Sequence, residues 1–370
     1  MYIYENPQWP VFTWNTKELL EPLTAVRHQQ GRLLGRMQSI GFPLQQEATF
    51  TFLTQEVIKS SEIEGEFLDE AEVRSSLARH LGLEYGGQVV EVGRNVEGVV
   101  EMRLDAVQHF KDPLTQSRLF DWHAGLFPTG RSGIRKIRVG QWRDDATGPM
   151  EVLSGAMGKE KIHFRAPPAS QLEQEMARFL QWFNEEKLSP PLDPILKAAL
   201  AHLWFLTIHP FEDGNGRIAR TLSDMVLARS EGTVQRFYSL SAQIRLDRKE
   251  YYQVLEAAQK GGLEVTPWLV WLIRCLGRAM EAAQVTTEKI LYKAQFWQTM
   301  ATMSLHQRQR DMLNRLLDGF TGALTSSKWA QLTKCSQDTA LRDLRDLVEK
   351  GILVQSPAGG RSTHYSLRKS

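Results

Sequence analysis

The chain has 370 residues, of which 42% are hydrophobic and 24% are charged, and its formal net charge is +2. This composition is that of an ordinary folded protein with room for two or three domains. So small a charge gives no reason to expect a uniformly basic nucleic-acid binder, although local basic patches remain open. The two cysteines, Cys275 and Cys335, lack the spacing of a zinc site or a disulfide framework. Because neither a secretion signal nor a membrane-spanning apolar run is visible, we expect a cytoplasmic protein without a membrane partner.

The first third of the chain is predicted to be helical. Residues 1–45 open with clustered aromatic side chains, which usually pack on a neighbouring part of the protein, and continue in a helix from Lys17 to about Ile40. A second helix is expected over Leu44 to Glu64, and Gly65 is suited to end it. Apolar residues at helical spacing continue through residues 66–128.

Glu64 lies in the last turn of that second helix, four residues after Ser60 and on the same face. A carboxylate at a helix C-terminus is mildly disfavoured by the helix dipole, so Glu64 calls for a cation from elsewhere in the molecule. On periodicity alone, a solvated glutamate is the simpler interpretation.

Between Gly130 and Pro168 the pattern becomes extended. Residues 134–140 alternate, and a second extended segment, residues 161–164, follows a glycine-rich turn at Gly155–Gly158. This predicts a hairpin in an otherwise helical protein, and such a hairpin could hold a target segment by strand addition. A solvated strand face explains the basic residues of the first segment more simply.

Two helices surround the most informative stretch. Residues 198–208 are almost entirely apolar and predict a buried helix, which Pro210 ends because proline has no amide donor. Apolar residues from Ile218 onward recur at helical spacing, so a second helix is predicted to start near Asn215. The junction, residues 209–220, reads HPFEDGNGRIAR.

The start of that second helix is suited to bind phosphate. The first amides of a helix lack internal partners and attract anions. Gly214 and Gly216 let the backbone approach a phosphate closely, and Asn215 offers a side-chain amide. Arg217 and Arg220 share a helical face and supply forked donors that match phosphate oxygens.

The loop before the helix supplies the remaining groups for nucleotide chemistry. Asp213 or Glu212 offers a carboxylate for Mg²⁺, which usually lies between carboxylates and substrate phosphates. His209 titrates near neutrality and is therefore the natural general base. Together these features indicate a nucleotide-transfer site.

Three other motifs with glycines at similar spacing do not apply. The dinucleotide-binding fingerprint must follow a strand, whereas a helix precedes this one. A calcium loop requires glycine where the chain has Ile218. A Walker loop requires Gly-Lys-Ser/Thr, which residues 209–220 lack.

Residues 209–220 match, position for position, the H-P-F-x-[DE]-G-N-G-R-x-x-R signature of the Fic family, so the chain resembles a Fic protein. The typical activity of that family is transfer of AMP from ATP to a protein hydroxyl. The resemblance implies that His209 deprotonates the target hydroxyl and that Asp213 holds Mg²⁺. It also implies that residues at the start of the second helix bind the phosphates of ATP: Gly214, Asn215, Gly216, Arg217 and Arg220.

The resemblance gives meaning to three further segments. Tyr251 or Tyr252 would line the adenine pocket, although a place in the core explains either one equally well. Ser60, Glu64 and Gly65 fit the [ST]-x-x-x-E-[GN] inhibitory motif of autoinhibited Fic proteins. By that resemblance, Glu64 would pair with Arg220 and occupy the space that the ATP γ-phosphate needs. The hairpin would be the flap of a Fic core.

Residues 286–370 are expected to form a separate domain. Helices are predicted over Leu305–Leu317, Ser326–Thr333 and Gln337–Leu347, and a β-hairpin over 351–367. This order resembles a winged helix. Three arginines could contact DNA phosphates: Arg342, Arg345 and Arg361. Three aspartates dilute the charge of the presumed recognition helix: Asp338, Asp343 and Asp346.

We therefore expect a mainly α protein with an N-terminal Fic-associated module (1–45), a Fic core with an inhibitory helix and a β-hairpin flap (46–285), and a C-terminal winged helix-turn-helix domain (286–370). The expected activity is transfer of AMP from ATP, with Mg²⁺, to a Tyr, Thr or Ser hydroxyl of a protein, including the chain itself, autoinhibited by Glu64. One alternative is a de-AMPylating phosphodiesterase in which Glu64 positions water. Another is a DNA-binding regulator that uses the Fic core as a nucleotide sensor. Homodimer formation is left open.

Overall fold

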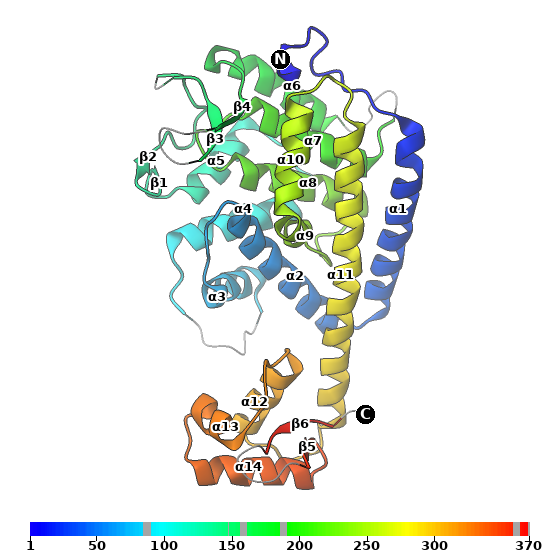
Figure 1. Ribbon diagram of the computed structural model, residues 1–370, viewed down its shortest axis with the longest axis vertical. Coiled ribbons are helices and arrows are strands. Elements are labelled where there is room, and N and C mark those ends of the chain that lie inside the picture. Colours follow the sequence, from blue (N-terminus) through cyan, green and yellow to red (C-terminus); the bar gives the residue numbers. More distant parts are fainter. Residues whose placement is uncertain (84–89, 147, 156–160, 186–190, 358–362, 369–370) are drawn as a thin grey trace. The chain divides into compact units, whose positions relative to one another are not determined.

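The computed structural model describes residues 1–83, 90–146, 148–155, 161–185, 191–357 and 363–368. Helices dominate both of its compact units, Met1–Val285 and Thr286–Ser370 (Figure 1). The expectation of a mainly helical protein is therefore confirmed, whereas the three domains and their boundaries stay predictions. None of the helices in the described part of the chain has the length and apolar character that crossing a membrane requires.

The first unit is built from helices and two short hairpins. Its helices are α1 (Thr16–Ser39), α2 (Phe42–Ile63), α3 (Glu70–Leu81), α4 (Arg94–Gln108), α5 (Gln116–Leu126), α6 (Leu172–Asn184), α7 (Pro194–Ile208), α8 (Asn215–Glu231), α9 (Leu240–Leu246), α10 (Arg248–Gln259) and α11 (Thr266–Thr299), of which α11 ends in the second unit. Its strands are β1 (Arg131–Ser132), β2 (Arg135–Lys136), β3 (Glu151–Ser154) and β4 (Lys161–Arg165).

Helices α7 and α8 pack against each other and form the centre of the first unit. Asp193 caps α7 by accepting from the amide of Ile195, and every residue of α7 from 198 to 208 is buried. Helix α8 begins at Asn215, directly after Gly214, as the sequence predicted. The loop between these two helices is therefore held from both sides by the core.

Helix α2 lies against α3, α4, α8 and α9. It ends one residue before Glu64, which is its C-cap, and Gly65 follows with φ of 84°. Glu56 anchors the helix from within, because its buried carboxylate accepts from the hydroxyl of Ser239 and lies 3.1 Å from Arg103 of α4.

The aromatic opening packs on the first unit, as the sequence predicted. The ring of Tyr2 lies edge-on to Phe164 of β4, with ring centroids 5.2 Å apart. The ring of Trp9 meets Trp204 of α7 in the same way, at 6.0 Å. The N-terminal segment thereby braces both the β3–β4 hairpin and the central helix.

The predicted strand over residues 134–140 is wrong for most of its length. Only Arg135–Lys136 is extended and paired, because Gly133, with φ of 55°, turns the chain back so that β2 pairs with β1. Ile137 then leaves the strand and is buried, which explains the misleading alternation. The longer hairpin instead joins β3 to β4, with a bulge between Val152 and Leu153. Of the predicted turn at Gly155–Gly158, only Gly155 lies within the described residues.

The second unit contains three helices followed by an antiparallel hairpin. These elements are α12 (Gln307–Leu317), α13 (Ser326–Thr333), α14 (Gln337–Glu349), β5 (Leu353–Gln355) and β6 (Tyr365–Leu367). They enclose a core around Trp329, Leu344 and Met312. Their order is the one that the sequence predicted, and Arg361 lies outside the described residues.

Candidate active site

The loop between α7 and α8 is closed by its own polar groups. His209 caps α7 in the left-handed region, with φ of 53°. Asn215 Oδ1 accepts from the amide of Phe211 at 3.0 Å, and Asn215 Nδ2 donates to the carbonyl of Phe211 at 2.8 Å. The Asn215 side chain therefore shapes the loop, and its main-chain amide lies at the start of α8. The ring of Phe211 stacks on His123 at 4.1 Å and fixes the loop to the core.

The structure explains why positions 214 and 216, at the start of α8, are glycine. Gly214 has φ of 81°, and a Cβ there would lie 3.0 Å from the ring of Phe127. A Cβ on Gly216 would lie 2.1 Å from Oε1 of Glu64, so any other residue there would displace that carboxylate from its present position. The end of the α2 segment therefore places an anion against the first turn of α8, where the unpaired helix amides favour negative charge.

Arg220 holds that carboxylate. Its Nη2 lies 2.7 Å from Glu64 Oε1, which is the pairing that the resemblance implied. The guanidinium is 1% exposed and also donates to Ser60, through Nε to Oγ at 2.9 Å and through Nη2 to the carbonyl at 2.9 Å. Arg103 of α4 donates to the same Ser60 hydroxyl at 2.9 Å. Ser60 thus joins α2 to two buried cations.

Glu66 makes a second, similar contact that the sequence reasoning missed. Its Oε2 lies 2.5 Å from Nη1 of Arg217, which is 2% exposed. Burial raises the pKa of Glu66 against the opposing charge of Arg217, and the nearby charges of Asp213 and Glu64 raise it further. The carboxylate that caps α2 and one from the segment that follows it therefore face two guanidiniums of α8.

Each of these arginines retains an unused donor. Arg217 Nε and Arg220 Nη1 are buried and have no hydrogen-bond partner among the described residues. A buried guanidinium N–H without an acceptor is unfavourable, so an anion with more oxygens than one carboxylate would satisfy this pair better.

His209 lies beside the same helix start. Burial lowers the pKa of its imidazole to about 4, so the ring is neutral at physiological pH. Its Nδ1 lies 3.2 Å from the carbonyl of Leu206. When Nδ1 donates to that carbonyl, Nε2 keeps its lone pair and can accept a proton.

Arg143 holds the His209 loop in place, and sequence reasoning missed this role. Its Nε donates to the carbonyl of His209 at 2.8 Å, and its main-chain amide donates to the carbonyl of Pro210 at 2.9 Å. Nη2 of the same side chain donates to the carbonyl of Pro167 at 2.6 Å. No local motif marks this role, because these three acceptors are main-chain oxygens; the remaining Nη1 donates to Asp145 at 3.0 Å.

The two candidate metal ligands differ in their surroundings. Glu212 lies 3.6 Å from the guanidinium of Arg135. Asp213 instead accepts from neutral donors, the hydroxyl of Ser132 and the amide of Gly214. Among the described residues, Asp213 belongs to no group of three side chains close enough to cage an ion. Its single uncompensated carboxylate fits Mg²⁺ that shares its coordination with phosphate oxygens.

A cavity of about 860 Å³ opens beside these groups, between the β3–β4 hairpin and α10. Glu64, His209 and Gly216 lie on its wall together with Tyr251 and Tyr252. This volume lies within the range of nucleotide-sized pockets, roughly 300–1,000 Å³.

The two tyrosines have different roles in that wall. Tyr251 is 1% exposed and its hydroxyl lies 2.8 Å from Nε2 of His202, so it belongs chiefly to the core. Tyr252 is 37% exposed, and its hydroxyl lies 3.4 Å from Glu64 Oε2. Burial and the charge of Glu64 raise the pKa of Tyr252 to about 12.

The hairpin is fastened to α10 by a contact that the sequence did not reveal. Nδ1 of His163 on β4 lies 2.6 Å from Glu256 on α10. Nε2 of the same ring lies 2.5 Å from the hydroxyl of Ser154 on β3. This chain of polar groups fixes the hairpin over the cavity.

Comparison with known proteins supplies the family of this site. Residues 113–227 match the model of the Fic/DOC family. This stretch is therefore similar to Fic/DOC domains. The matched stretch contains the whole dodecapeptide and the hairpin beside it. Residues 2–83, which include Ser60, Glu64 and Glu66, match a domain of unknown function, DUF4172. The ion pairs of Glu64 and Glu66 therefore join the DUF4172 stretch to the Fic/DOC domain.

The chain is similar to curated proteins named protein adenylyltransferase Fic. The one from Nematostella vectensis is 36% identical over 124 residues, which are 33% of this chain and 26% of that protein. The one from Drosophila melanogaster is 33% identical over 115 residues, 31% of this chain and 22% of that protein. The matched part thus spans about a quarter of the length of these relatives.

Solved structures show the same fold. A Fic family protein from Desulfovibrio desulfuricans aligns over 95% of this chain and 96% of its own, with a TM-score of 0.55 and 20% identity. A Fic domain containing signaling protein from Bacteroides thetaiotaomicron aligns over 71% of this chain and 98% of its own, with a TM-score of 0.53 and 21% identity.

Proposed function

We propose that the chain is a protein adenylyltransferase, which moves AMP from ATP to a Tyr, Thr or Ser hydroxyl of a protein, its own chain included. The observation that carries the proposal is the position of Glu64. Its carboxylate lies over Gly216 and 2.7 Å from Arg220, at a helix start with two buried guanidiniums. A site that receives one internal anion in this way has the charge and the donors for a triphosphate.

The proposed reaction uses His209 as the base. His209 Nε2 takes the proton of the target hydroxyl, whose oxygen attacks the α-phosphorus of ATP in line. The bond from that phosphorus to the bridging oxygen breaks, pyrophosphate leaves, and the AMP stays on the target oxygen. The α8 amides, Arg217 and Arg220 stabilise the charge that develops on the phosphates. Asp213 would hold Mg²⁺, which supplies further positive charge there.

In the same proposal, α2 restrains the enzyme. The γ-phosphate of ATP and the carboxylate of Glu64 compete for Arg220, and only one of them can occupy the space above Gly216. The contacts of Ser60 with Arg103 and Arg220 support this arrangement, because they hold the end of α2 against α8. We propose that Glu66 acts in the same sense on Arg217.

The experiment is labelling with ATP that carries a radioactive α-phosphorus, in the presence of Mg²⁺. Native chain, Glu64→Gly and the His209→Ala/Glu64→Gly double variant are compared for label on the chain itself. The proposal expects weak labelling of the native chain, stronger labelling of Glu64→Gly, and none of the His209→Ala/Glu64→Gly double variant. Equal labelling of the double variant and Glu64→Gly would contradict it. Removal of AMP is tested by adding native protein or Glu64→Gly to a chain that already carries the label. Faster loss of label with the native protein would instead favour the de-AMPylating activity.

A second candidate function is DNA binding by the second unit, which we propose to be a winged helix. Two of the three aspartates that dilute the charge of α14 are engaged inside the unit. Asp343 is 5% exposed and is paired with Arg308 at 2.6 Å, and Asp346 is paired with Lys350 at 2.6 Å. Arg342 and Arg345 are exposed and have no hydrogen bond or ion pair within the described residues.

Those two arginines make the candidate testable in the full chain. Binding to duplex DNA should weaken steeply with salt, and Arg342→Ala with Arg345→Ala should reduce the slope by about 2 in log units. Arg32→Ala, a change of an exposed arginine on α1, is the control and should leave the slope unchanged. Absence of salt-dependent binding would leave the second unit without this function.

A further inference from the structure

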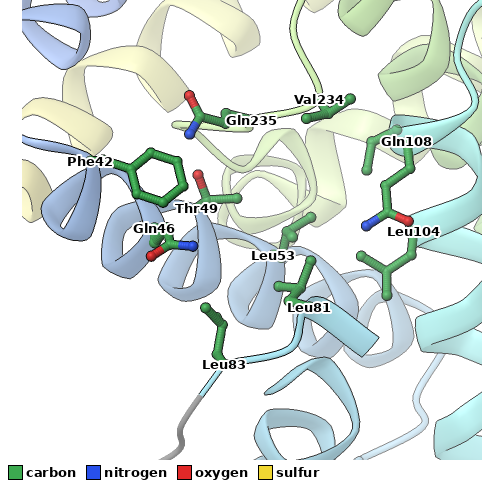
Figure 2. Close-up of a pocket in the computed structure, with 11 residues that line it drawn as sticks. Phe42, Gln46, Thr49, Leu53, Leu81, Leu83, Leu104, Gln108, Val234 and Gln235 are labelled. Carbon is green, nitrogen blue, oxygen red and sulfur yellow. The ribbon is translucent and has the colours of Figure 1, made fainter. Parts of the chain in front are cut away.

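Helix α2 borders a second cavity, remote in sequence from the dodecapeptide. The cavity has a volume of about 190 Å³ and lies between α2, α3, α4 and the loop that follows α8 (Figure 2). Seven apolar side chains, three glutamines and Thr49 line it, and none of these lining residues is charged. Such a wall excludes an ionic ligand, because a buried charge without a partner is strongly unfavourable.

One polar atom of this wall is buried and has no hydrogen-bond partner within the described residues. Thr49 is 8% exposed, and its Oγ1 has no hydrogen-bond partner among the described residues. A buried helical threonine usually donates to the carbonyl four residues earlier, as Thr54 of the same helix does to Phe50 at 2.7 Å. In Figure 2 the Thr49 hydroxyl points into the space between Gln46 and Gln235.

The glutamines at the rim can complete a polar contact. Gln46 and Gln235 are half-buried and Gln108 is exposed, and their side-chain amides have no hydrogen-bond partner within the described residues. Each amide offers both a donor and an acceptor. A ligand hydroxyl inside the cavity could therefore form one hydrogen bond with the Thr49 hydroxyl. The same ligand hydroxyl could form its second hydrogen bond with the side-chain amide of a rim glutamine.

We propose that this cavity is a binding site for a small uncharged alcohol or phenol of about the size of one ring. The volume supports that size, since a dry cavity of about 150 Å³ holds benzene and this one is somewhat larger. The apolar walls take the hydrocarbon part of the ligand. The single hydroxyl of the ligand forms a hydrogen bond with the Thr49 hydroxyl, which has no partner within the described residues.

Occupation of the cavity would act on the helix that carries Glu64. Phe42, Thr49 and Leu53 of α2 form one wall, and Leu104 of α4 lies on another. Arg103, next to Leu104, donates to Ser60 at the far end of α2. A ligand that separates α2 from α4 would loosen this contact and thereby the pair of Glu64 with Arg220. This regulatory consequence rests on the proposed function, whereas the binding site does not.

The binding test uses the full chain with labelled leucine and valine methyl groups, followed by NMR. The probes are 4-methylphenol and toluene, which share a shape and differ by the hydroxyl. We expect 4-methylphenol to shift the methyl signals of Leu53, Leu104 and Val107 and to bind about five- to tenfold tighter than toluene, the worth of one net hydrogen bond. No shift of these signals at millimolar probe, or equal affinity for the two probes, would overturn the proposal.

Two variants sharpen the test. Thr49→Val keeps the shape and removes the hydroxyl, so it should abolish the preference for 4-methylphenol, whereas the control Thr54→Val should retain it. Val234→Trp, a change at a position that is 48% exposed, should close the cavity without disturbing the core and should prevent both probes from binding. Binding of the probes that is unchanged in Thr49→Val and in Val234→Trp would place them elsewhere and refute the site.

The regulatory consequence has its own readout. 4-Methylphenol should raise self-labelling of the native chain and leave that of Glu64→Gly unchanged. Methyl shifts without a change in labelling would refute the coupling while the binding site stands. Absence of labelling in every form would count against the proposed function and leave the NMR result unaffected.

Discussion

The carboxylate of Glu64 lies 2.7 Å from the guanidinium of Arg220 and fills the space that a Cβ on residue 216 would need. These two residues are far apart in the sequence: Glu64 lies at the end of α2, and Arg220 lies in the first turns of α8. The length of this ion pair therefore reports how closely the end of α2 is held against the start of α8, the proposed phosphate site. Each of the following predictions probes one group that sets this contact.

Ser60 is predicted to be the anchor of the contact. Its hydroxyl accepts from both Arg103 and Arg220, so Ser60→Ala leaves two buried N–H groups unpaired and should destabilise the first unit by roughly 1–3 kcal/mol. The neighbouring hydroxyl of Ser61 is buried and has no hydrogen-bond partner within the described residues, so Ser61→Ala should be neutral or slightly stabilising. Thermal unfolding of the two variants measures the difference, and equal melting temperatures would contradict the anchoring role.

Glu66 is predicted to restrain Arg217 as Glu64 restrains Arg220. Glu66→Gln removes the charge and should raise the affinity for Mg²⁺–ATP by a few-fold only, because the Glu66 side chain is 43% exposed and its ion pair is screened by water. Glu62→Gln, which changes a carboxylate in the last turn of α2 that is paired with Lys59, is the control. Equilibrium binding measures both variants. Weaker ATP binding by Glu66→Gln than by Glu62→Gln would mean that Glu66 organises the site instead.

His209 is predicted to act as a base over an unusually wide pH range. Burial lowers its pKa to about 4, and a base is active in its deprotonated form, which prevails above that pKa. The kcat/KM of Glu64→Gly for ATP should therefore stay level as pH falls from 8 to about 5 and decline only below that. The profile of labelling rate against pH measures this. A decline centred near 6.5, the usual pKa of histidine, would show that the imidazole is not buried in the active form.

The first unit is predicted to lose stability in mild acid. Burial lowers the pKa of His123 to about 4 and that of His202 to about 3. A histidine whose folded pKa lies below its unfolded pKa of about 6.5 stabilises the fold above pH 6.5, and this contribution is lost as pH falls toward the folded pKa. The melting temperature should therefore fall between pH 6.5 and 4, and His202→Gln should flatten that slope. The exposed His28→Gln is the control, and an equal slope for both variants would contradict the prediction.

Local signals in the sequence sufficed for much of the fold. Gly214 before an apolar repeat located the start of α8, and the local pattern of residues 326–333 located α13 at Ser326–Thr333. These features are decided within a few residues of the chain, so a single sequence contains them. The dodecapeptide located the candidate site for the same reason, since most of its groups are consecutive.

Contacts between distant segments could not be predicted in this way. The pairing of Glu66 with Arg217 depends on how Gly65 redirects the chain after α2, and Arg143 fixes the His209 loop through a main-chain carbonyl 66 residues away in the sequence. The error over residues 134–140 has a similar cause. Ile137 lies between polar residues because its side chain is buried in the core, and it does not belong to a paired strand. The hydrogen bonds by which the Asn215 side chain closes the loop onto Phe211 were not predicted either, and its binding of phosphate stays a prediction.

The affinity of the chain for Mg²⁺–ATP with and without the Glu64 carboxylate tests the central claim most directly. Calorimetric titration of the native chain and of Glu64→Gly compares the two states of Arg220. If Glu64 occupies the place of the γ-phosphate, the variant should bind ATP at least about tenfold more tightly, the worth of one charge-assisted hydrogen bond, while ADP should gain much less. Equal affinity of both proteins for ATP would contradict the claim that this carboxylate and the triphosphate share one site.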